Sequence, residues 1–390
     1  MSVLFAQQAE VQNIRSIITY LAADDLQGRG TGTAEQDSAA NYIARYFAKI
    51  GLTPKGEDGF FQTFTSSPVH STRRDISIRN VIGFLDYGKK NTLIIGAHYD
   101  HLGLGNDQNS REMKPEGLIH NGADDNASGV AGVLELARII KTSGKAWNYN
   151  FLFICFSGEE LGLLGSAYFA NYPTIALADA DCMLNMDMIG RLTDKKIELS
   201  GVGTSDAWIP LFNNLNMDKN FVLTYDSSGV GASDHTSFYL KDIPVVHFFT
   251  GGHSDYHKTT DDIDKINFEG EKEILDFMYK AITKIDSLPK LTFLKTKEKK
   301  SATTASFKVT LGIMPDYMYN EGGVRADGVS EGKSGYKAGM KSGDIIVKLG
   351  KYEVKDIYAY MEALSKFKKG DKTTLMVKRD GKNIKLKVVF

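Results

Sequence analysis

The 390-residue sequence lacks three features, and each absence excludes a class of protein. No apolar run approaches the roughly 20 residues that a membrane-spanning helix requires, so we expect no membrane span. Only two cysteines are present, Cys155 and Cys182, and both lie in apolar segments, which favours buried free thiols over a disulfide framework. Basic residues are interleaved with acidic ones rather than grouped with aromatic side chains, so we expect no nucleic-acid partner.

Charge is distributed unevenly along the chain, although its net charge is only −1. Residues 290–390 contain 22 basic and 11 acidic residues, a balance of +11, and the remainder carries −12. A difference in net charge of this size between two parts of one chain favours two separate domains. The lysine-rich and Ser/Thr-rich segment 289–305 indicates a linker between them. We therefore predict one domain at 1–288 and a second at 306–390.

The first ten residues, MSVLFAQQAE, lack a basic start, and their apolar run is too short for a working signal peptide. They fit the end of a signal region that precedes a small-residue cleavage site, and they also fit a frayed terminus. From the first of these readings we expect an extracytoplasmic protein, periplasmic or secreted.

Apolar residues recur at helical spacing in several segments of the first domain, and short apolar runs typical of buried strands alternate with them. The helical segments are 11–24, 36–51, 126–144 and 267–286, with Asn126 or Ser128 capping the third. The strand-like segments are 92–97, 151–156, 181–190 and 243–252. This alternation predicts an α/β fold with a mostly parallel central sheet flanked by helices on both faces. Ligands of such sheets gather at the carboxyl ends of the strands.

The most hydrophobic strand runs directly into two adjacent glutamates, Glu159 and Glu160, in FLFICFSGEELGLLGS. Other polar residues follow the remaining strands or precede a helix, namely His98, Asp100, Asp124, Asp125, Asp187, Tyr256 and His257. In a parallel sheet these side chains would meet at one edge. So many carboxylates in one place predict a compensating positive charge, because buried like charges repel.

The cation that suits two imidazoles and several carboxylates is a divalent transition metal, with zinc the first choice. One aspartate bridging two ions, with one histidine and one carboxylate on each, completes a two-metal site. We predict that its ligands are His98, Asp125, Glu160, Asp187 and His257. Glu160 then binds metal, and Glu159 stays unbound and can take a proton from the attacking water.

Two of these ligands have a competing neighbour: Asp124 competes with Asp125, and His253 competes with His257. Structural roles are available for the remaining histidines of this region, His101, His120, His235 and His247. Asp234, beside His235, is a candidate supporting carboxylate behind the metal ligands.

Five motifs, in this order, resemble the co-catalytic zinc aminopeptidase family of the bacterial leucine aminopeptidase type, to which glutaminyl cyclases are related. They are GAHYDHLG, NGADDNASG, FSGEELGLLGS, NMDMIG and DYHKTTDD, and an earlier segment, LAADDLQGRGTGT, resembles the amino-terminal part of the same family. The similarity covers roughly residues 10–288 and implies two Zn²⁺ per chain. It places His98 and Asp187 on one ion and Glu160 and His257 on the other, with Asp125 bridging.

The resemblance also implies roles around the metals. Glu159 would be the general base, and Tyr256 would help to hold the oxyanion. Asp100 would orient the ring of His98, which is the task of a carboxylate beside a metal-bound imidazole. Related glutaminyl cyclases tend to carry tryptophan next to the last histidine, so Tyr256 favours the peptidase branch.

The C-terminal module resembles a PDZ domain of the kind found in bacterial proteases, chiefly in AGMKSGDIIVKLG. Its carboxylate-binding loop would lie in VTLGIMPDY, around Leu311, Gly312 and Ile313, and would offer backbone N–H groups to the C-terminus of a peptide. KSGYKAG lacks the proline often found there, and RDGKN predicts a hairpin. The alternative is a small β-rich packing or oligomerisation module that binds no peptide.

Together these features predict a metallo-aminopeptidase that hydrolyses the N-terminal residue of peptides or proteins with a free N-terminus. Glutaminyl cyclisation or carboxypeptidase-type cleavage on the same scaffold is one alternative. A peptide-binding adaptor without catalysis is another, and the presence of all five ligands argues against it.

Overall fold

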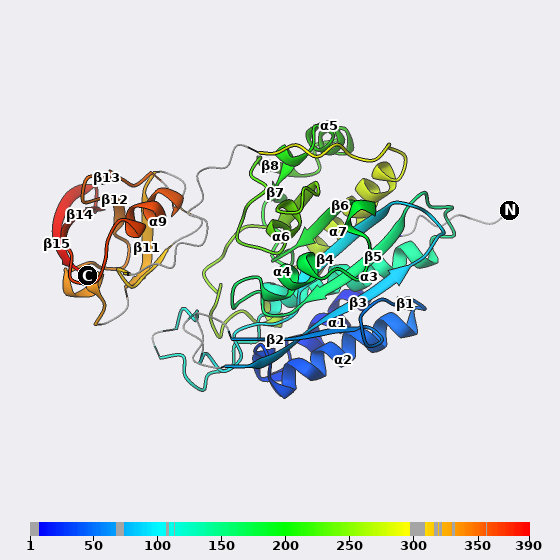
Figure 1. The fold of residues 1–390 in the computed structure, drawn as a ribbon, viewed down its shortest axis with the longest axis horizontal. Coiled ribbons are helices and arrows are strands. Elements are labelled where there is room, and N and C mark those ends of the chain that lie inside the picture. Colours follow the sequence, from blue (N-terminus) through cyan, green and yellow to red (C-terminus); the bar gives the residue numbers. More distant parts are fainter. Residues whose placement is uncertain are drawn as a thin grey trace. The chain divides into compact units, whose positions relative to one another are not determined.

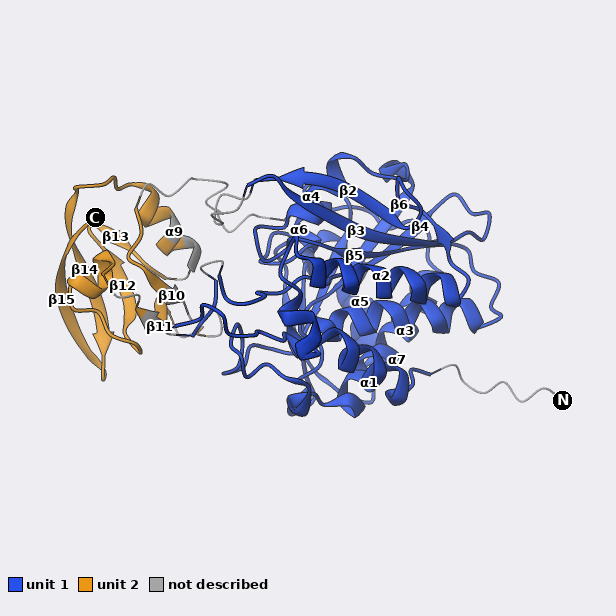
Figure 2. Cartoon of the chain, turned by 90° about the horizontal axis from the view of Figure 1, so that it is seen from below, with its two compact units in different colours: residues 1–297 blue, residues 298–390 orange. Residues whose placement is uncertain are grey.

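The computed structural model describes residues 8–67, 74–106, 109–112, 114–296, 309–315, 319, 322–329, 332–355 and 357–390. The chain divides into two compact units, Met1–Lys297 and Glu298–Phe390, shown in blue and orange in Figure 2. This division falls inside the predicted linker 289–305, of which residues 297–305 lie outside the described part, as do the N-terminal residues 1–7. The domain limits 1–288 and 306–390 themselves stay predictions.

The first unit is built on a nine-stranded sheet in the order β1-β3-β5-β4-β6-β9-β7-β8, with β2 paired to β3 (Figure 1). Its strands are β1 Thr53–Pro54, β2 Phe61–Ser66, β3 Ile76–Leu85, β4 Thr92–His98, β5 Asn150–Phe156, β6 Ala180–Met186, β7 Lys196–Ser200, β8 Val222–Asp226 and β9 Val245–Phe249. The central strands β5, β4, β6 and β9 are parallel to one another. Strand β3 pairs antiparallel with β1, β2 and β5, and β7 pairs antiparallel with β9. The α/β prediction is confirmed, for a sheet that is parallel at its centre and mixed at its edges.

Helices cover both faces of this sheet (Figures 1 and 2). One face carries α1 Val11–Leu21, α2 Ala34–Lys49, α3 Gly129–Thr142, α5 Trp208–Leu215 and α7 Phe268–Ile285. The other carries α4 Leu164–Asn171 and α6 His235–Tyr239. Short helical turns are η1 Asp24–Arg29, η2 Ala123–Ser128, η3 Leu177–Asp179, η4 Val202–Thr204 and η5 Ile263–Lys265.

The central strands are buried on both faces, which explains their uninterrupted apolar sequences. In β5, Phe151 and Phe153 pack into the core under α3 and α7, and Leu152 and Ile154 pack into the core under α4 and α6. Both cysteines are buried and free, as predicted. In the parts of the chain that the structure describes, no helix combines the length and the apolar character needed to cross a bilayer.

The second unit is a six-stranded antiparallel sheet in the order β10-β11-β12-β14-β15, with β13 paired to β12. Its elements are β10 Ile313–Pro315, β11 Val324–Val329, α8 Ser334–Lys337, β12 Ile345–Leu349, β13 Tyr352–Glu353, α9 Ile357–Ser365, β14 Lys372–Arg379 and β15 Lys382–Val389. The predicted hairpin is confirmed, since Arg379 pairs with Lys382. Its two turn residues, Asp380 and Gly381, have φ of 49° and 76°, the left-handed values that this tight turn requires.

Candidate metal centre and active site

The predicted ligands do meet at one edge of the sheet, because they lie at or near the carboxyl ends of parallel strands. His98 is the last residue of β4, Glu160 follows β5, and Asp187 follows β6 directly. Asp125 lies in η2, just before α3, and His257 lies in the loop after β9. Ser128 occupies the N-cap position of α3 but makes no side-chain capping hydrogen bond, and the side chain of Asn126, inside η2, accepts the backbone N–H of Gly129 at 2.9 Å instead.

The ligand atoms form two groups that share Asp125. His98 Nε2 lies 3.4 Å from Asp125 Oδ1 and 3.4 Å from Asp187 Oδ1. His257 Nε2 lies 3.2 Å from Asp125 Oδ2 and 3.1 Å from Glu160 Oε2. Each oxygen of the shared carboxylate therefore faces a different histidine, as expected of a bridging ligand.

Both histidines present their Nε2 atoms to these carboxylates with the other ring nitrogen already occupied. His98 Nδ1 lies 3.2 Å from the carbonyl oxygen of Asp100, and His257 Nδ1 lies 2.8 Å from that of Asn109. A carbonyl only accepts, so Nδ1 carries the hydrogen and Nε2 is free to bind a metal, which is the usual arrangement of metal-bound imidazoles.

Donor spacing gives a second test of whether two zinc ions fit. In tetrahedral zinc sites with metal–ligand distances of about 2.0–2.1 Å, two donors on one ion lie about 3.4 Å apart. The four nitrogen–oxygen distances above are 3.1–3.4 Å. In addition, Asp125 Oδ2 is buried and has no hydrogen-bond partner among the described residues. These residues therefore fit the implied metals.

Without metal, the histidines themselves supply the positive charge. Burial lowers the pKa of His98, but the nearby carboxylates of Asp187 and Glu159 outweigh it and hold that pKa well above its ordinary value. Burial likewise lowers the pKa of His257, and Glu160 and Asp125 raise it well above the ordinary value. For Glu160, burial raises the pKa, but the positive charge of His257 has the larger effect and lowers it to about 2.

Glu159 has a different environment from its neighbour. Its side chain is 11% exposed, and Oε2 approaches His98 Nε2 only to 4.0 Å. Burial raises the pKa of Glu159 well above its usual range; His98 lowers it, but the nearby carboxylates of Asp187 and Glu160 raise it further. The two adjacent glutamates are thus chemically distinct, one paired with imidazole and one left as a free carboxyl group.

The comparison with family models decides which family this site belongs to. Residues 80–282, just over half of the chain, match the model of peptidase family M28. The chain belongs to peptidase family M28. Residues 309–389 match the PDZ domain model, so the resemblance found in both halves of the sequence is confirmed.

Curated relatives of this M28 peptidase include leupeptin-inactivating enzyme 1 of Streptomyces exfoliatus, 28% identical over 253 residues, 64% of this chain and 50% of the relative. Aminopeptidase YwaD of Bacillus subtilis (strain 168) is 29% identical over 204 residues, 46% of this chain and 42% of the relative. The chain spans about half the length of the curated relatives it matches.

Among solved structures, a leucine aminopeptidase precursor from Bacteroides thetaiotaomicron matches with a TM-score of 0.59 and 19% identity over 70% of this chain and 97% of that chain. A glutaminyl cyclase from the same organism matches with a TM-score of 0.58 and 19% identity over 70% of this chain and 98% of that chain. At these identities the likeness shows the fold alone.

The two competing neighbours in this M28 site bind each other. Asp124 Oδ2 lies 3.0 Å from His253 Nε2, and Asp124 Oδ1 accepts the backbone N–H of Gly190 at 2.7 Å. Asp124 and His253 are therefore already paired with each other. Asp125 and His257 are left as the residues that face the other predicted metal ligands.

Asp100 lies where predicted but contacts different atoms. Its carboxylate accepts the backbone N–H of Glu159 at 3.1 Å, the N–H of Glu160 at 3.4 Å and the hydroxyl of Thr31 at 2.7 Å. It lies 3.7 Å from His98 Nδ1, longer than a hydrogen bond, and the carbonyl of Asp100 is the closer partner of that ring. The side chain of Asp100 thus chiefly fixes the turn that carries both glutamates.

Tyr256 lies against His257, whereas Asp234 lies near His98. The ring of Tyr256 stacks on His257, with 3.9 Å between centroids, and the guanidinium of Arg111 lies 5.7 Å from its centre. Asp234 immediately precedes α6 and is fully buried, and burial raises its pKa to about 7 although His98 lowers it. The other two histidines of this side, His235 and His247, stack on each other at 4.8 Å.

Sequence reasoning did not identify Arg29 and assigned His101 no role at the metals. Arg29 is buried, and its guanidinium donates to a set of backbone carbonyls, those of Leu21, Tyr99, Asn121, Gly122 and Asp125. Burial lowers the pKa of Arg29 to about 10, although nearby carboxylates raise it, so the guanidinium stays charged at neutral pH. His101 Nδ1 lies 2.8 Å from Glu160 Oε1. The signals were in the sequence, as the arginine of LQGRG and the second histidine of HYDH.

In the PDZ unit, the predicted loop precedes β10. Leu311 is buried and its carbonyl accepts the N–H of Gly335 at 2.8 Å, and Gly312 has a φ of 69°. The N–H of Gly312 donates to the Thr310 hydroxyl at 2.9 Å, and Ile313 begins β10.

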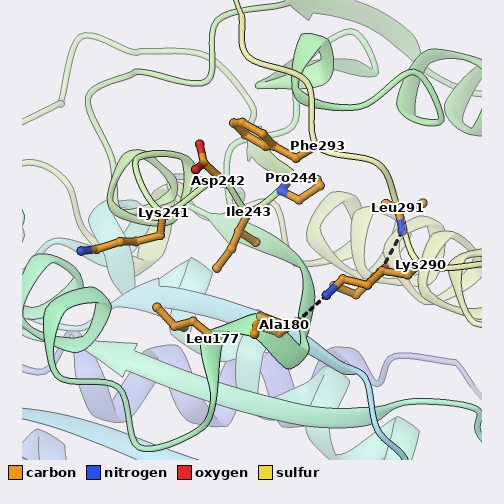
Figure 3. A pocket seen from close by; sticks show the side chains of 11 residues that line it. Leu177, Ala180, Lys241, Asp242, Ile243, Pro244, Lys290, Leu291 and Phe293 are labelled. Carbon is orange, nitrogen blue, oxygen red and sulfur yellow. Dashed lines mark hydrogen bonds between the residues drawn. The ribbon is translucent and has the colours of Figure 1, made fainter.

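A cavity of about 350 Å³ lies at the opposite end of the central strands (Figure 3). Ala180, the first residue of β6, and Pro244, just before β9, line it, together with Lys290, Leu291 and Phe293. None of the predicted metal ligands lines it, so this cavity is separate from the candidate active site.

Proposed function

We propose that this M28 peptidase is an aminopeptidase that removes the N-terminal residue of peptides or proteins at a site holding two Zn²⁺. The observation that carries the proposal is the shared carboxylate of Asp125, which faces one imidazole with each oxygen while the Glu159 carboxyl group stays 4.0 Å from His98 Nε2. The aminopeptidase among the curated relatives supports the same activity.

Residues for both metals are available. His98 and Asp187 would hold one ion, Glu160 and His257 the other, and Asp125 would lie between them. When bound, the two ions would polarise the peptide carbonyl and lower the pKa of water from 15.7 to about 7.

Glu159 is the proposed general base. Its free carboxylate accepts a proton from the attacking water and later returns it to the leaving amine. Asp100 fixes its position by accepting the Glu159 backbone N–H. Tyr256, stacked on His257, is the proposed donor to the oxyanion that forms at the scissile carbonyl. The acidic surroundings would attract the ammonium group of the substrate, and the proposed preference for free N-termini follows from this attraction.

For the PDZ unit we propose binding of a peptide C-terminus at Leu311, Gly312 and Ile313, with the peptide added as a strand beside β10. The left-handed Gly312 supports a turned loop of this kind, and because the N–H of Gly312 donates to the Thr310 hydroxyl, a bound carboxylate would have to displace that hydroxyl. A binding test with peptides that have free or amidated C-termini would show whether the carboxylate is recognised.

The activity is tested with a panel of amino-acid arylamides, dipeptides and N-blocked peptides, run together with metal analysis. We expect hydrolysis of free N-termini only, about two zinc ions per chain, and loss of activity on chelation that zinc restores. Glu159→Gln should keep its metal and lose about 10²–10⁴-fold in turnover. Glu116→Gln, an exposed glutamate, is the matched control.

Two results would contradict the proposal in different ways. Cyclisation of N-terminal glutamine without peptide hydrolysis would assign the site to the cyclase reaction instead. A Glu159→Gln variant as active as Glu116→Gln would remove Glu159 from the role of general base.

A further inference from the structure

His101 is held rigidly next to the candidate metal site. It follows β4, its backbone N–H donates to the carbonyl of Arg29 at 3.3 Å, and it pairs with Gly30 as an isolated bridge. Its buried ring packs edge-on against His257, with 5.8 Å between centroids and 74° between planes. A Cβ on Gly122 would come within 2.5 Å of the ring, so glycine is required there for the ring to fit.

The ring of His101 makes the shortest contact to the side chain of Glu160. His101 Nδ1 lies 2.8 Å from Oε1, whereas His257 Nε2 lies 3.1 Å from Oε2. Asn109 Nδ2 is the next polar group, at 3.5 Å from Oε2. The two oxygens of Glu160 therefore have separate tasks, one facing His101 and the other facing His257.

His101, Asp125 and Glu160 lie close enough together to hold an ion, but the short contact between His101 and Glu160 favours a hydrogen bond over metal ligation by His101. Its 2.8 Å contact to Glu160 is shorter than the roughly 3.4 Å between donors on one tetrahedral zinc, and its 3.8 Å separation from Asp125 Oδ2 is longer. A contact of 2.8 Å is instead typical of an N–H donating to a carboxylate. Nε2 of His101 is buried and has no hydrogen-bond partner among the described residues, which fits a neutral ring with its hydrogen on Nδ1.

We propose that His101 is a positioning residue for the second metal: it donates Nδ1–H to Glu160 Oε1 and so aims Oε2 at the ion shared with Asp125 and His257. The proposal rests on the two-zinc site of the proposed function. Without this hydrogen bond the Glu160 carboxylate can rotate away from the ion, so one zinc should bind more weakly and the other should not.

The test is stepwise zinc binding to metal-free protein, measured by competition with a chromogenic chelator. Four variants are compared with the wild type: His101→Ala, His101→Asn, His101→Gln and His120→Asn. An asparagine amide can occupy the place of Nδ1 and keep the donor, whereas a glutamine amide lies near the place of Nε2 and misses Glu160. His120 is the control, because its ring contacts Ser110 and Leu118 and does not contact Glu160.

We expect one binding step of His101→Ala and His101→Gln to weaken about 10–100-fold, the usual effect of removing the partner of a metal ligand. His101→Asn should stay close to the wild type, and so should His120→Asn. Tryptophan fluorescence verifies folding, and the Asn/Gln pair carries the test if the alanine variant does not fold.

Equal affinities for the Asn and Gln variants, whether both normal or both weakened, would overturn the positioning role. A wild type that takes up two zinc ions alongside such a result would leave the aminopeptidase proposal intact. A wild type that binds no zinc would overturn both proposals together.

Discussion

Replacing Arg29 by lysine should destabilise the first unit strongly, even though the charge is kept. The guanidinium spans five backbone carbonyls that come from three separate segments of the chain. Three of them, in Asn121, Gly122 and Asp125, belong to the segment that carries the shared carboxylate. An ammonium group has only three donors, all on one atom, so it cannot reach carbonyls on every side of the flat guanidinium.

The size of the effect follows from this geometry. The carbonyl of Gly122 also accepts the Ala127 N–H at 3.2 Å, so lysine leaves at least one of the other four carbonyls without a donor in a fully buried place. A buried polar group without a partner costs about 1–3 kcal/mol, so we expect Arg29→Lys to lower the free energy of unfolding by at least about 1–3 kcal/mol. Arg45→Lys, on the exposed side of α2, should change it by less than about 0.5 kcal/mol.

Urea unfolding followed by tryptophan fluorescence measures this unit alone. The two tryptophans, Trp147 and Trp208, both lie in the first unit and both are buried. The shift in midpoint, at unchanged slope, gives the difference in stability. If Arg29→Lys unfolds at the same urea concentration as Arg45→Lys, the guanidinium network does not stabilise the active-site segment as argued.

Two further predictions concern protons and the second unit. Metal-free protein should lose stability as pH rises above about 6.5, because His98, His257 and Asp234 have raised pKa values when folded, whereas the lowered pKa values of His120, His235 and His247 act in the opposite sense only below that pH. Zinc protection should grow over the same range, since the ion displaces protons from the imidazoles, and fluorescence-detected melting that is flat with pH would contradict this. In the second unit, buried Asp344 accepts two hydrogen bonds from Arg379, at 2.6 and 2.8 Å. Asp344→Ala should therefore lower the stability of that unit by about 2 kcal/mol in circular dichroism, with the tryptophan transition unchanged.

The parts of the site that follow directly from strand order were predictable from the sequence. Apolar runs that end in His98, in the doubled glutamate and near Asp187 indicate buried parallel strands, and parallel strands bring their carboxyl ends together. The resemblance already favoured Asp125 over Asp124, and the structure adds a physical reason, since Asp124 pairs with His253, 129 residues away in sequence.

Other features depend on packing that no local pattern encodes. No strand was predicted at β2 or β3, and their antiparallel pairing with each other and with β5 makes the sheet mixed. The carboxylate of Asp100 lies 3.7 Å from His98 Nδ1 and also accepts amides 59 and 60 residues away, which no local pattern indicates. The extracytoplasmic location stays a prediction, because the N-terminal residues that suggested it lie outside the described part.

The adjacent glutamates show how one short turn produces two chemical roles. Asp100 accepts both of their backbone N–H groups, so the turn is fixed and each side chain has a defined direction. Glu160 faces two imidazoles and its pKa falls to about 2, whereas burial, together with the carboxylates of Asp187 and Asp234, raises that of Glu159 despite the opposing charge of His98. A carboxylate that stays ionised suits a metal ligand, and one with a raised proton affinity suits a general base. The difference between ligand and base therefore arises from the surroundings of each residue and not from its type.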